Sequence, residues 1–223
     1  MGRARIATTS CALLFVAAIG VAAVIDVNDV NHPRATAASG AGLHRVQPAR
    51  SAAITPAATA PDKAPAAAHP LPRSAPVRVE IPAIGVDSTL VSLGLQADGT
   101  LQVPPAGFPA GWYAGAPTPG ERGPAIVVGH VDWGGRAGVF YRLHELKPDD
   151  QITITRADSS TATFLVTAVQ QFPKAQFPTA LVYGNLNYAG LRLITCSGGF
   201  DPHARSYQDN TVVFAELVSA SPG

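Results

Sequence analysis

Two residues with the chemistry of a cysteine enzyme end two separate strand-like runs of the sequence. The run LRLITC ends in Cys196, and the run PAIVVGH ends in His130, 66 residues earlier. A thiol with an ordinary pKa of ~8.5 is mostly protonated at neutral pH, so a nucleophilic cysteine needs an imidazole or a cation beside it. Side chains at strand ends are accessible yet held by rigid structure, so the pair predicts nucleophilic catalysis. A small buried hydrophobe is the alternative interpretation of Cys196.

The nearest cation that follows the thiol along the chain is Arg205, nine residues after Cys196. We expect the segment from Gly198 to Asn210 to fold back over the strand end and carry its guanidinium to the site. Arginine keeps its charge at neutral pH, so it can donate hydrogen bonds to a developing oxyanion but cannot act as a base. Arg192 and Arg136 are the alternative cations.

Four residues near the two strand ends are candidate substrate-binding residues: Asp132, Trp133, Thr195 and Tyr207. Asp132 follows His130 by two residues and is a candidate for orienting the imidazole. Thr195 precedes Cys196 and should point to the opposite face of an extended strand. The sequence holds no D-x-D-x-D-G run and no glycine-rich phosphate loop after a strand, so we expect neither a metal nor a cofactor.

The part of the chain that must position these residues is rich in β-branched residues. From Val77 onward, short apolar runs alternate with turn signals, and no helical periodicity extends over a dozen residues. We expect an all-β domain, and closure into an eight-stranded barrel would remove exposed strand edges. The predicted strands are Val77–Ile81, Thr89–Leu95, Thr100–Val103, Ala125–Gly129, Gln151–Thr155, Thr161–Gln171, Leu191–Thr195 and Thr211–Val218, with short helices within Gly138–Leu146 and Thr179–Tyr183.

A candidate membrane anchor precedes this domain. The segment Ile6–Ile25 holds 20 consecutive uncharged residues, and at ~1.5 Å per helical residue it spans a bilayer core of ~30 Å. Arg3 and Arg5 precede it, whereas Asp26 and Asp29 follow it. The positive-inside rule therefore predicts a single-pass membrane protein with a cytoplasmic amino terminus and an extracytoplasmic domain. A cleaved signal peptide is the alternative.

Between the anchor and the β-rich domain lies a segment poor in core-forming residues. Residues 32–76 hold eight Pro and fifteen Ala without an aromatic residue, so they cannot bury enough apolar surface to offset chain entropy. We therefore predict an anchor at residues 1–25, a disordered linker at 26–76 and a catalytic domain at 77–223. The net charge of the whole chain is only +1, which gives no reason to expect a nucleic-acid partner.

Taken together, these motifs resemble those of the sortases, the membrane-anchored cysteine transpeptidases of Gram-positive bacteria. IVVGHVD, LITC and an arginine nine residues later carry the resemblance, and similar stretches cover most of residues 77–218. The stretches VRVEIPAIGVD, GVFYRLHELKPDD and SYQDNTVVFAEL are similar to the actinobacterial class E and F branches, and more to class F.

The resemblance implies an eight-stranded β-barrel in which Cys196 is the nucleophile, His130 the acid/base and Arg205 the residue that holds the substrate carbonyl. It implies secreted protein substrates with an LPxTG-like carboxy-terminal sorting signal. A thioester would form at the cysteine, and the Thr carbonyl would pass to a peptidoglycan precursor or another amine acceptor. Two alternatives remain: a pilus-polymerising sortase that uses a protein lysine, and a noncatalytic membrane-tethered β-barrel that binds cell-surface ligands.

Overall fold

The computed structural model describes residues 68–223. The predicted anchor at Ile6–Ile25 and most of the predicted linker lie outside these residues. Within the described part of the chain, no helix is long and apolar enough to cross a membrane.

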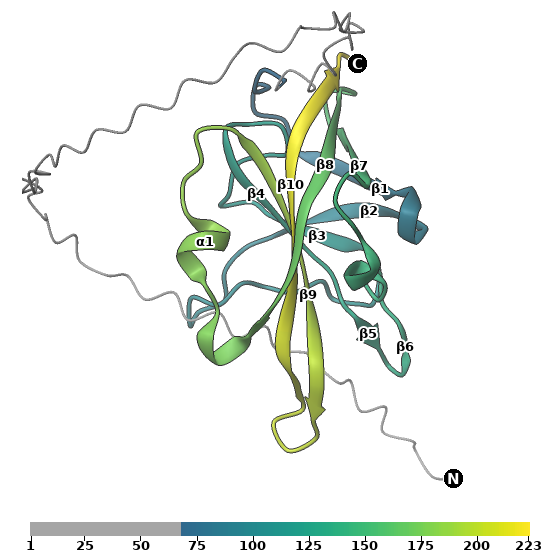
Figure 1. Cartoon of the computed structure of the whole chain (residues 1–223), viewed down its shortest axis with the longest axis vertical. Coiled ribbons are helices and arrows are strands. Elements are labelled where there is room, and N and C mark those ends of the chain that lie inside the picture. The colour runs from purple at the N-terminus through teal and green to yellow at the C-terminus, as the bar shows by residue number, and fades with distance from the viewer. Residues whose placement is uncertain (1–67) are drawn as a thin grey trace, which may run out of the picture. The chain divides into compact units, whose positions relative to one another are not determined.

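Eight strands close a barrel in the order β1-β2-β3-β4-β9-β10-β8-β7 (Figure 1). They are β1 Pro76–Ile81, β2 Val86–Leu93, β3 Ala110–Tyr113, β4 Gly123–Val128, β7 Gln151–Arg156, β8 Thr161–Pro173, β9 Ala189–Asp201 and β10 Ser206–Ser221. A separate two-stranded sheet pairs β5 Asp132–Trp133 with β6 Arg136–Ala137. The helices are short: α1 Thr179–Tyr183 and the 3-10 turns Pro82–Ile84, Leu143–Glu145 and Lys174–Gln176. The predicted all-β, closed eight-stranded fold is confirmed.

One of the eight predicted strands is wrong. Residues 100–103 form no strand, and only an isolated bridge joins Leu95 to Leu101. The barrel takes β3 instead. Pro104 and Pro105 follow the apolar run and offer no backbone N–H for a ladder, whereas the sequence of β3, AGWY, is too short to show alternation. Both segments predicted to hold a short helix do so: α1 spans Thr179–Tyr183, and a 3-10 helix at Leu143–Glu145 lies within Gly138–Leu146.

The strands of the barrel bury side chains on both faces. One apolar cluster takes residues from all eight strands and fills the barrel interior, including Leu191 and Leu193 of β9. A second cluster lies on the outer face of β4, β9 and β10, because alternate residues of a strand point to opposite sides. Its buried members are Leu93, Leu101, Ile126, Val128, Val182, Ile194, Cys196, Val212 and Phe214. We call this second set the outer cluster.

The residues just before β1 pack against the barrel. The Leu71 N–H donates to the Gly120 carbonyl at 2.8 Å, and the Pro72 carbonyl accepts a hydrogen bond from the buried guanidinium of Arg156. Arg73 forms an ion pair with Glu121 at 3.3 Å. The folded domain therefore includes residues 68–76, which the composition had assigned to the linker.

Candidate active site

His130 and Cys196 lie at the same level of two neighbouring strands. β4 and β9 are parallel, and Val128 pairs with Ile194. The Gly129 N–H donates to the Ile194 carbonyl at 3.1 Å, which extends this pairing beyond the end of β4. His130 follows Val128 by two residues, and Cys196 follows Ile194 by two residues. Both side chains therefore belong to the outer side of the barrel, where Val128 and Ile194 lie in the outer cluster.

The backbone around His130 is fixed by hydrogen bonds between residues 130–131 and residues 138–140. The His130 carbonyl accepts the Phe140 N–H at 3.0 Å, and the Gly138 N–H donates to the Val131 carbonyl at 2.9 Å. A side chain at Gly129 would place its Cβ 2.5 Å from a methyl carbon of Val139. The glycine of the VVGH motif is thus required by close packing, which holds the imidazole at one position.

His130 is 4% exposed, and its imidazole has two close neighbours. Its Nε2 lies 2.8 Å from the Pro104 carbonyl oxygen, and its ring centroid lies 4.8 Å from that of Trp133. Burial lowers the pKa of His130, while the Pro104 hydrogen bond and the charge of Asp132 oppose that change. A carbonyl oxygen can only accept, so Nε2 carries the proton and Nδ1 of the neutral ring is available to accept one.

The Cys196 thiol is covered in this structure. Only 4% of Cys196 is exposed, and the residue belongs to the outer cluster. Leu101, from the segment between β2 and β3, and Val182 of α1 are buried in the same cluster. Because so little of Cys196 is exposed, a peptide can reach the sulfur only if some of the residues that bury it move.

Three of the predicted substrate-binding residues meet beside His130. The Tyr207 hydroxyl of β10 donates to the Asp132 carboxylate at 2.8 Å, which connects β10 to the small β5–β6 sheet. Asp132, Trp133 and Tyr207 line a cavity of about 350 Å³ together with Gly134, Gly135 and Phe200. The structure thus joins these three residues in one site next to the imidazole.

The other two predicted residues lie elsewhere. Thr195 is buried on the opposite face of β9 from Cys196, the face of Leu191 and Leu193. Arg205 lies in the turn between β9 and β10, where its φ of 50° is typical of a tight turn.

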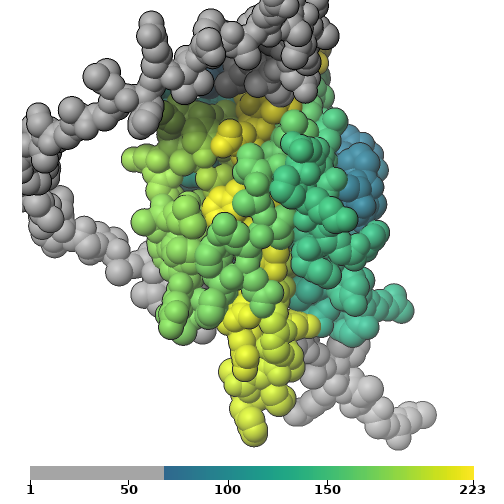
Figure 2. Space-filling model, viewed as in Figure 1, coloured from purple at the N-terminus to yellow at the C-terminus, as the bar shows by residue number. Residues whose placement is uncertain are grey.

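The segment from Gly198 to Asn210 does not fold back over the strand end, contrary to our expectation. It continues β9 and β10 as a hairpin that projects beyond the barrel (Figures 1 and 2). Asp201, the last residue of β9, is already about 16 Å from Cys196 at ~3.3 Å per residue, and Arg205 lies beyond it. The oxyanion role that we predicted for Arg205 would require this hairpin to bend.

Asn210 is not among the predicted site residues, yet it pairs directly with Cys196 across β9 and β10. Asn210 is 1% exposed. The sequence carries no signal for this position, because its place opposite the thiol depends on the register between β9 and β10.

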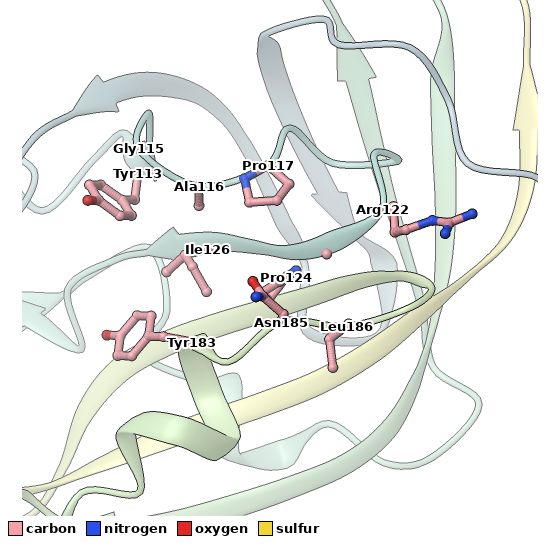
Figure 3. A pocket seen from close by; sticks show the side chains of 11 residues that line it. Tyr113, Gly115, Ala116, Pro117, Arg122, Pro124, Ile126, Tyr183, Asn185 and Leu186 are labelled. Carbon is pink, nitrogen blue, oxygen red and sulfur yellow. The ribbon is translucent and has the colours of Figure 1, made fainter. Parts of the chain in front are cut away.

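A second cavity, of about 320 Å³, lies between the β3–β4 connection and the segment that follows α1. Tyr113, Ile126 and Tyr183 gather at one end of it, and Arg122 lies at the other (Figure 3). Ile126 is also a member of the outer cluster. This cavity is therefore connected to the apolar surface that surrounds Cys196.

Residues 68–223 hold no group of three His, Cys, Asp or Glu side chains that could bind a metal ion. The described site consists of the Cys196 thiol, the imidazole of His130 and the neighbouring amide of Asn210.

A family model named as the sortase domain matches residues 79–218. The chain belongs to the sortase family. These 140 residues contain both strand ends of the site, and the family is one of cysteine transpeptidases. The assignment to class E or F stays a prediction. No curated protein matches the chain.

Solved sortase structures share the fold. Sortase A from Corynebacterium diphtheriae is 21% identical, with a TM-score of 0.50, and the match covers 68% of this chain and 64% of that chain. Listeria monocytogenes sortase A is 16% identical, with a TM-score of 0.51, and the match covers 68% of this chain and 92% of that one. At these identities the likeness establishes the barrel alone.

Proposed function

We propose that this sortase cleaves an LPxTG-like carboxy-terminal sorting signal through a thioester on Cys196 and transfers the Thr carbonyl to a cell-wall amine. The observation that carries the proposal is the common level and face of Cys196 and His130 on β9 and β4. The sorting motif itself follows from membership of the family, and so does the amine acceptor.

Acylation begins from a neutral pair, because burial lowers the pKa of His130 and favours its uncharged form. The proton of the Cys196 thiol passes to the imidazole, and the thiolate attacks the peptide carbonyl. The carbonyl carbon then carries sulfur, an oxyanion and the amine of the following residue. When this intermediate collapses, the C–N bond breaks and the leaving amine takes the proton from the imidazolium. A thioester and a neutral His130 remain.

The second half-reaction reverses these proton movements. The acceptor amine attacks the thioester carbonyl and gives a proton to the neutral imidazole, and the Cys196 thiolate leaves and recovers a proton. Both half-reactions use the two groups as a unit, so the apparent pKa values of the rate profile belong to the pair.

We assign the apolar part of the sorting signal to the cavity of Figure 3. Ile126 pairs with Arg192, four residues before Cys196, so this level of the barrel lies about 13 Å from the thiol at ~3.3 Å per residue. In an LPxTG-like motif, Leu precedes the Thr carbonyl by three residues, which span ~10 Å when extended. The two lengths agree to within about one residue, which favours the cavity as the place of the Leu-Pro end.

The burial of Cys196 favours a second function, a noncatalytic membrane-tethered binding module in which the thiol is only a core residue. A pilus-polymerising sortase is the alternative within the family. Cleavage assays on LPxTG and LAxTG peptides distinguish an enzyme from a binding module, because only an enzyme releases the fragment that begins with Gly. A lysine-containing peptide and a cell-wall amine, added as competing acceptors, distinguish a pilus-polymerising sortase from one that uses a cell-wall amine.

The experiment uses the full chain and its Cys196→Ala variant with this peptide panel. The proposal expects fragment release by the wild type and none by the variant. Absence of cleavage of every peptide, together with a Cys196 that resists small alkylating reagents, would favour the binding module.

A further inference from the structure

Asn210 and Cys196 face each other across an antiparallel pair of strands. Their direct pairing in the β9–β10 ladder places the two Cα atoms ~4.5–5.5 Å apart, with both side chains on the same face of the sheet. The face is the outer one, because Val212 and Phe214, two and four residues after Asn210, belong to the outer cluster with Cys196. No other side chain of β10 is directly paired with the thiol-bearing residue.

The side-chain amide oxygen of Asn210 is buried without a hydrogen-bond partner among the described residues. Asn210 is 1% exposed, and its Oδ1 has no partner among the described residues. A buried amide oxygen that accepts no hydrogen bond costs stability, so its presence calls for an explanation such as a catalytic role. A rotation of the amide by 180° exchanges oxygen and nitrogen, and the same position can then present an N–H donor.

The nearby arginines are worse placed to bind a carbonyl on Cys196. Arg205 lies in the turn of the projecting hairpin. Arg192 is on the outer face but four residues away, and its guanidinium stacks 4.6 Å from the centroid of the Phe214 ring and donates to the Leu191 carbonyl. Arg136 is exposed on β6. The amide of Asn210 is thus the hydrogen-bonding side chain opposite the nucleophile.

We propose that the Asn210 side-chain N–H donates a hydrogen bond to the scissile carbonyl oxygen as it becomes an oxyanion. This assignment rests on the proposed acyl transfer at Cys196. When the sulfur bonds to the carbonyl carbon, the electron pair of the C=O double bond moves to oxygen, and a donor fixed beside the sulfur stabilises that charge. When the C–N bond breaks, the pair returns to re-form the carbonyl. The amide gains and loses no proton.

Single-turnover acylation of the full chain by one cleaved peptide tests the assignment. Losing one oxyanion donor typically costs ~10²–10³ in rate, so we expect a loss of this size in Asn210→Ala. Asn187→Ala is the matched control, because Asn187 is an exposed asparagine in the connection between α1 and β9, and the acylation rate of this variant should equal that of the wild type. Alkylation of Cys196 by iodoacetamide forms no oxyanion, so Asn210→Ala should keep the wild-type alkylation rate if its fold is intact.

A second variant distinguishes a donor from a packing residue. Asn210→Asp keeps the shape of the side chain but replaces the donor by a carboxylate, which repels the oxyanion. We expect its acylation defect relative to the wild type to shrink as the pH falls, because a protonated carboxyl regains an O–H donor. A residue that only packs would give a defect that does not depend on pH.

Two outcomes would overturn the assignment. One is an acylation rate in Asn210→Ala within about tenfold of the wild type, less than the loss of a donor produces. The other is a collapse of acylation in Arg205→Lys with a near-normal Asn210→Asp, which would return the role to Arg205. A wild-type chain that forms no acyl-enzyme with any peptide defeats the proposed function first, and the role of Asn210 falls with it.

Discussion

The Nε2 atom of His130 lies 2.8 Å from the carbonyl oxygen of Pro104, a residue of the connection between β2 and β3. This contact sets the imidazole tautomer, because the carbonyl can only accept and Nε2 must therefore carry the hydrogen. The connection also contributes Leu101, which is buried in the outer cluster with Cys196. The same segment therefore orients the base and contributes a buried side chain to the cluster that contains the nucleophile.

We expect the stability of the domain to fall as the pH falls below ~6.5, the ordinary pKa of histidine. Burial lowers the pKa of His130 in the folded state, so below ~6.5 the unfolded chain binds the proton first and unfolding is favoured. Above a pH of ~6.5, His130 is neutral in both the folded and the unfolded state, so the stability no longer changes with its protonation. The slope of the thermal unfolding midpoint against pH should be smaller in His130→Gln than in the wild type. His144→Gln, at an exposed position, should keep the wild-type slope, and an equal slope in all three proteins would contradict the prediction.

His130→Ala should lower turnover by ~10²–10⁴, the usual contribution of a positioned general acid/base. His144 and His203 are both exposed, and their replacement by Ala should leave the steady-state rate of peptide cleavage close to that of the wild type. An essential His203 with a dispensable His130 would show that the proton acceptor has been misassigned.

Leu101→Ala should make the Cys196 thiol easier to reach. Shortening a side chain in the outer cluster removes packing over the sulfur, and a decrease of ~1.4 kcal/mol in the free energy of local opening corresponds to about tenfold faster alkylation. The matched control is Leu95→Ala, because Leu95 is the bridge partner of Leu101 but is 50% exposed. Alkylation that is equally fast in the wild type and both variants would mean that Leu101 does not limit access.

The anchor prediction concerns residues outside the described part of the chain. The mature protein extracted from membranes should retain Ile6–Ile25, because the nearest charged residues before this uncharged stretch are basic and the nearest after it are acidic. Amino-terminal sequencing checks this, and a first residue after Ala23 would show a cleaved signal peptide instead.

The barrel could be predicted from the sequence because most of its strands alternate apolar and polar residues or form continuous apolar runs. β3 was the exception, since four residues with the sequence AGWY carry no readable period. Residues 100–103 were wrongly predicted to form a strand, because TLQV has the composition of one. Leu101 is buried there because it packs in the outer cluster, and the segment joins no sheet. Composition thus indicated burial there but not pairing.

The site could be predicted where strand ends are visible in the sequence. Cys196 and His130 each end an apolar run, and the parallel pairing of β4 with β9 brings the two ends level. Asn210 was missed because the polar run SYQDNT has no chemical signature, and its importance depends on register. Arg205 was favoured because it is near Cys196 along the chain, but a long hairpin separates residues that are close in sequence.

Intact-mass spectrometry of the full chain mixed with LPxTG and LAxTG peptides tests the central claim most directly. We predict an added mass equal to the peptide fragment that ends in Thr, located at Cys196 and removed by hydroxylamine, as a thioester is. The adduct should be absent from Cys196→Ala and unchanged in Cys11→Ala, which replaces the cysteine of the predicted anchor Ile6–Ile25. An adduct that survives in Cys196→Ala, or a wild type that acquires none from any peptide while its thiol still reacts with iodoacetamide, would contradict acyl transfer at this residue.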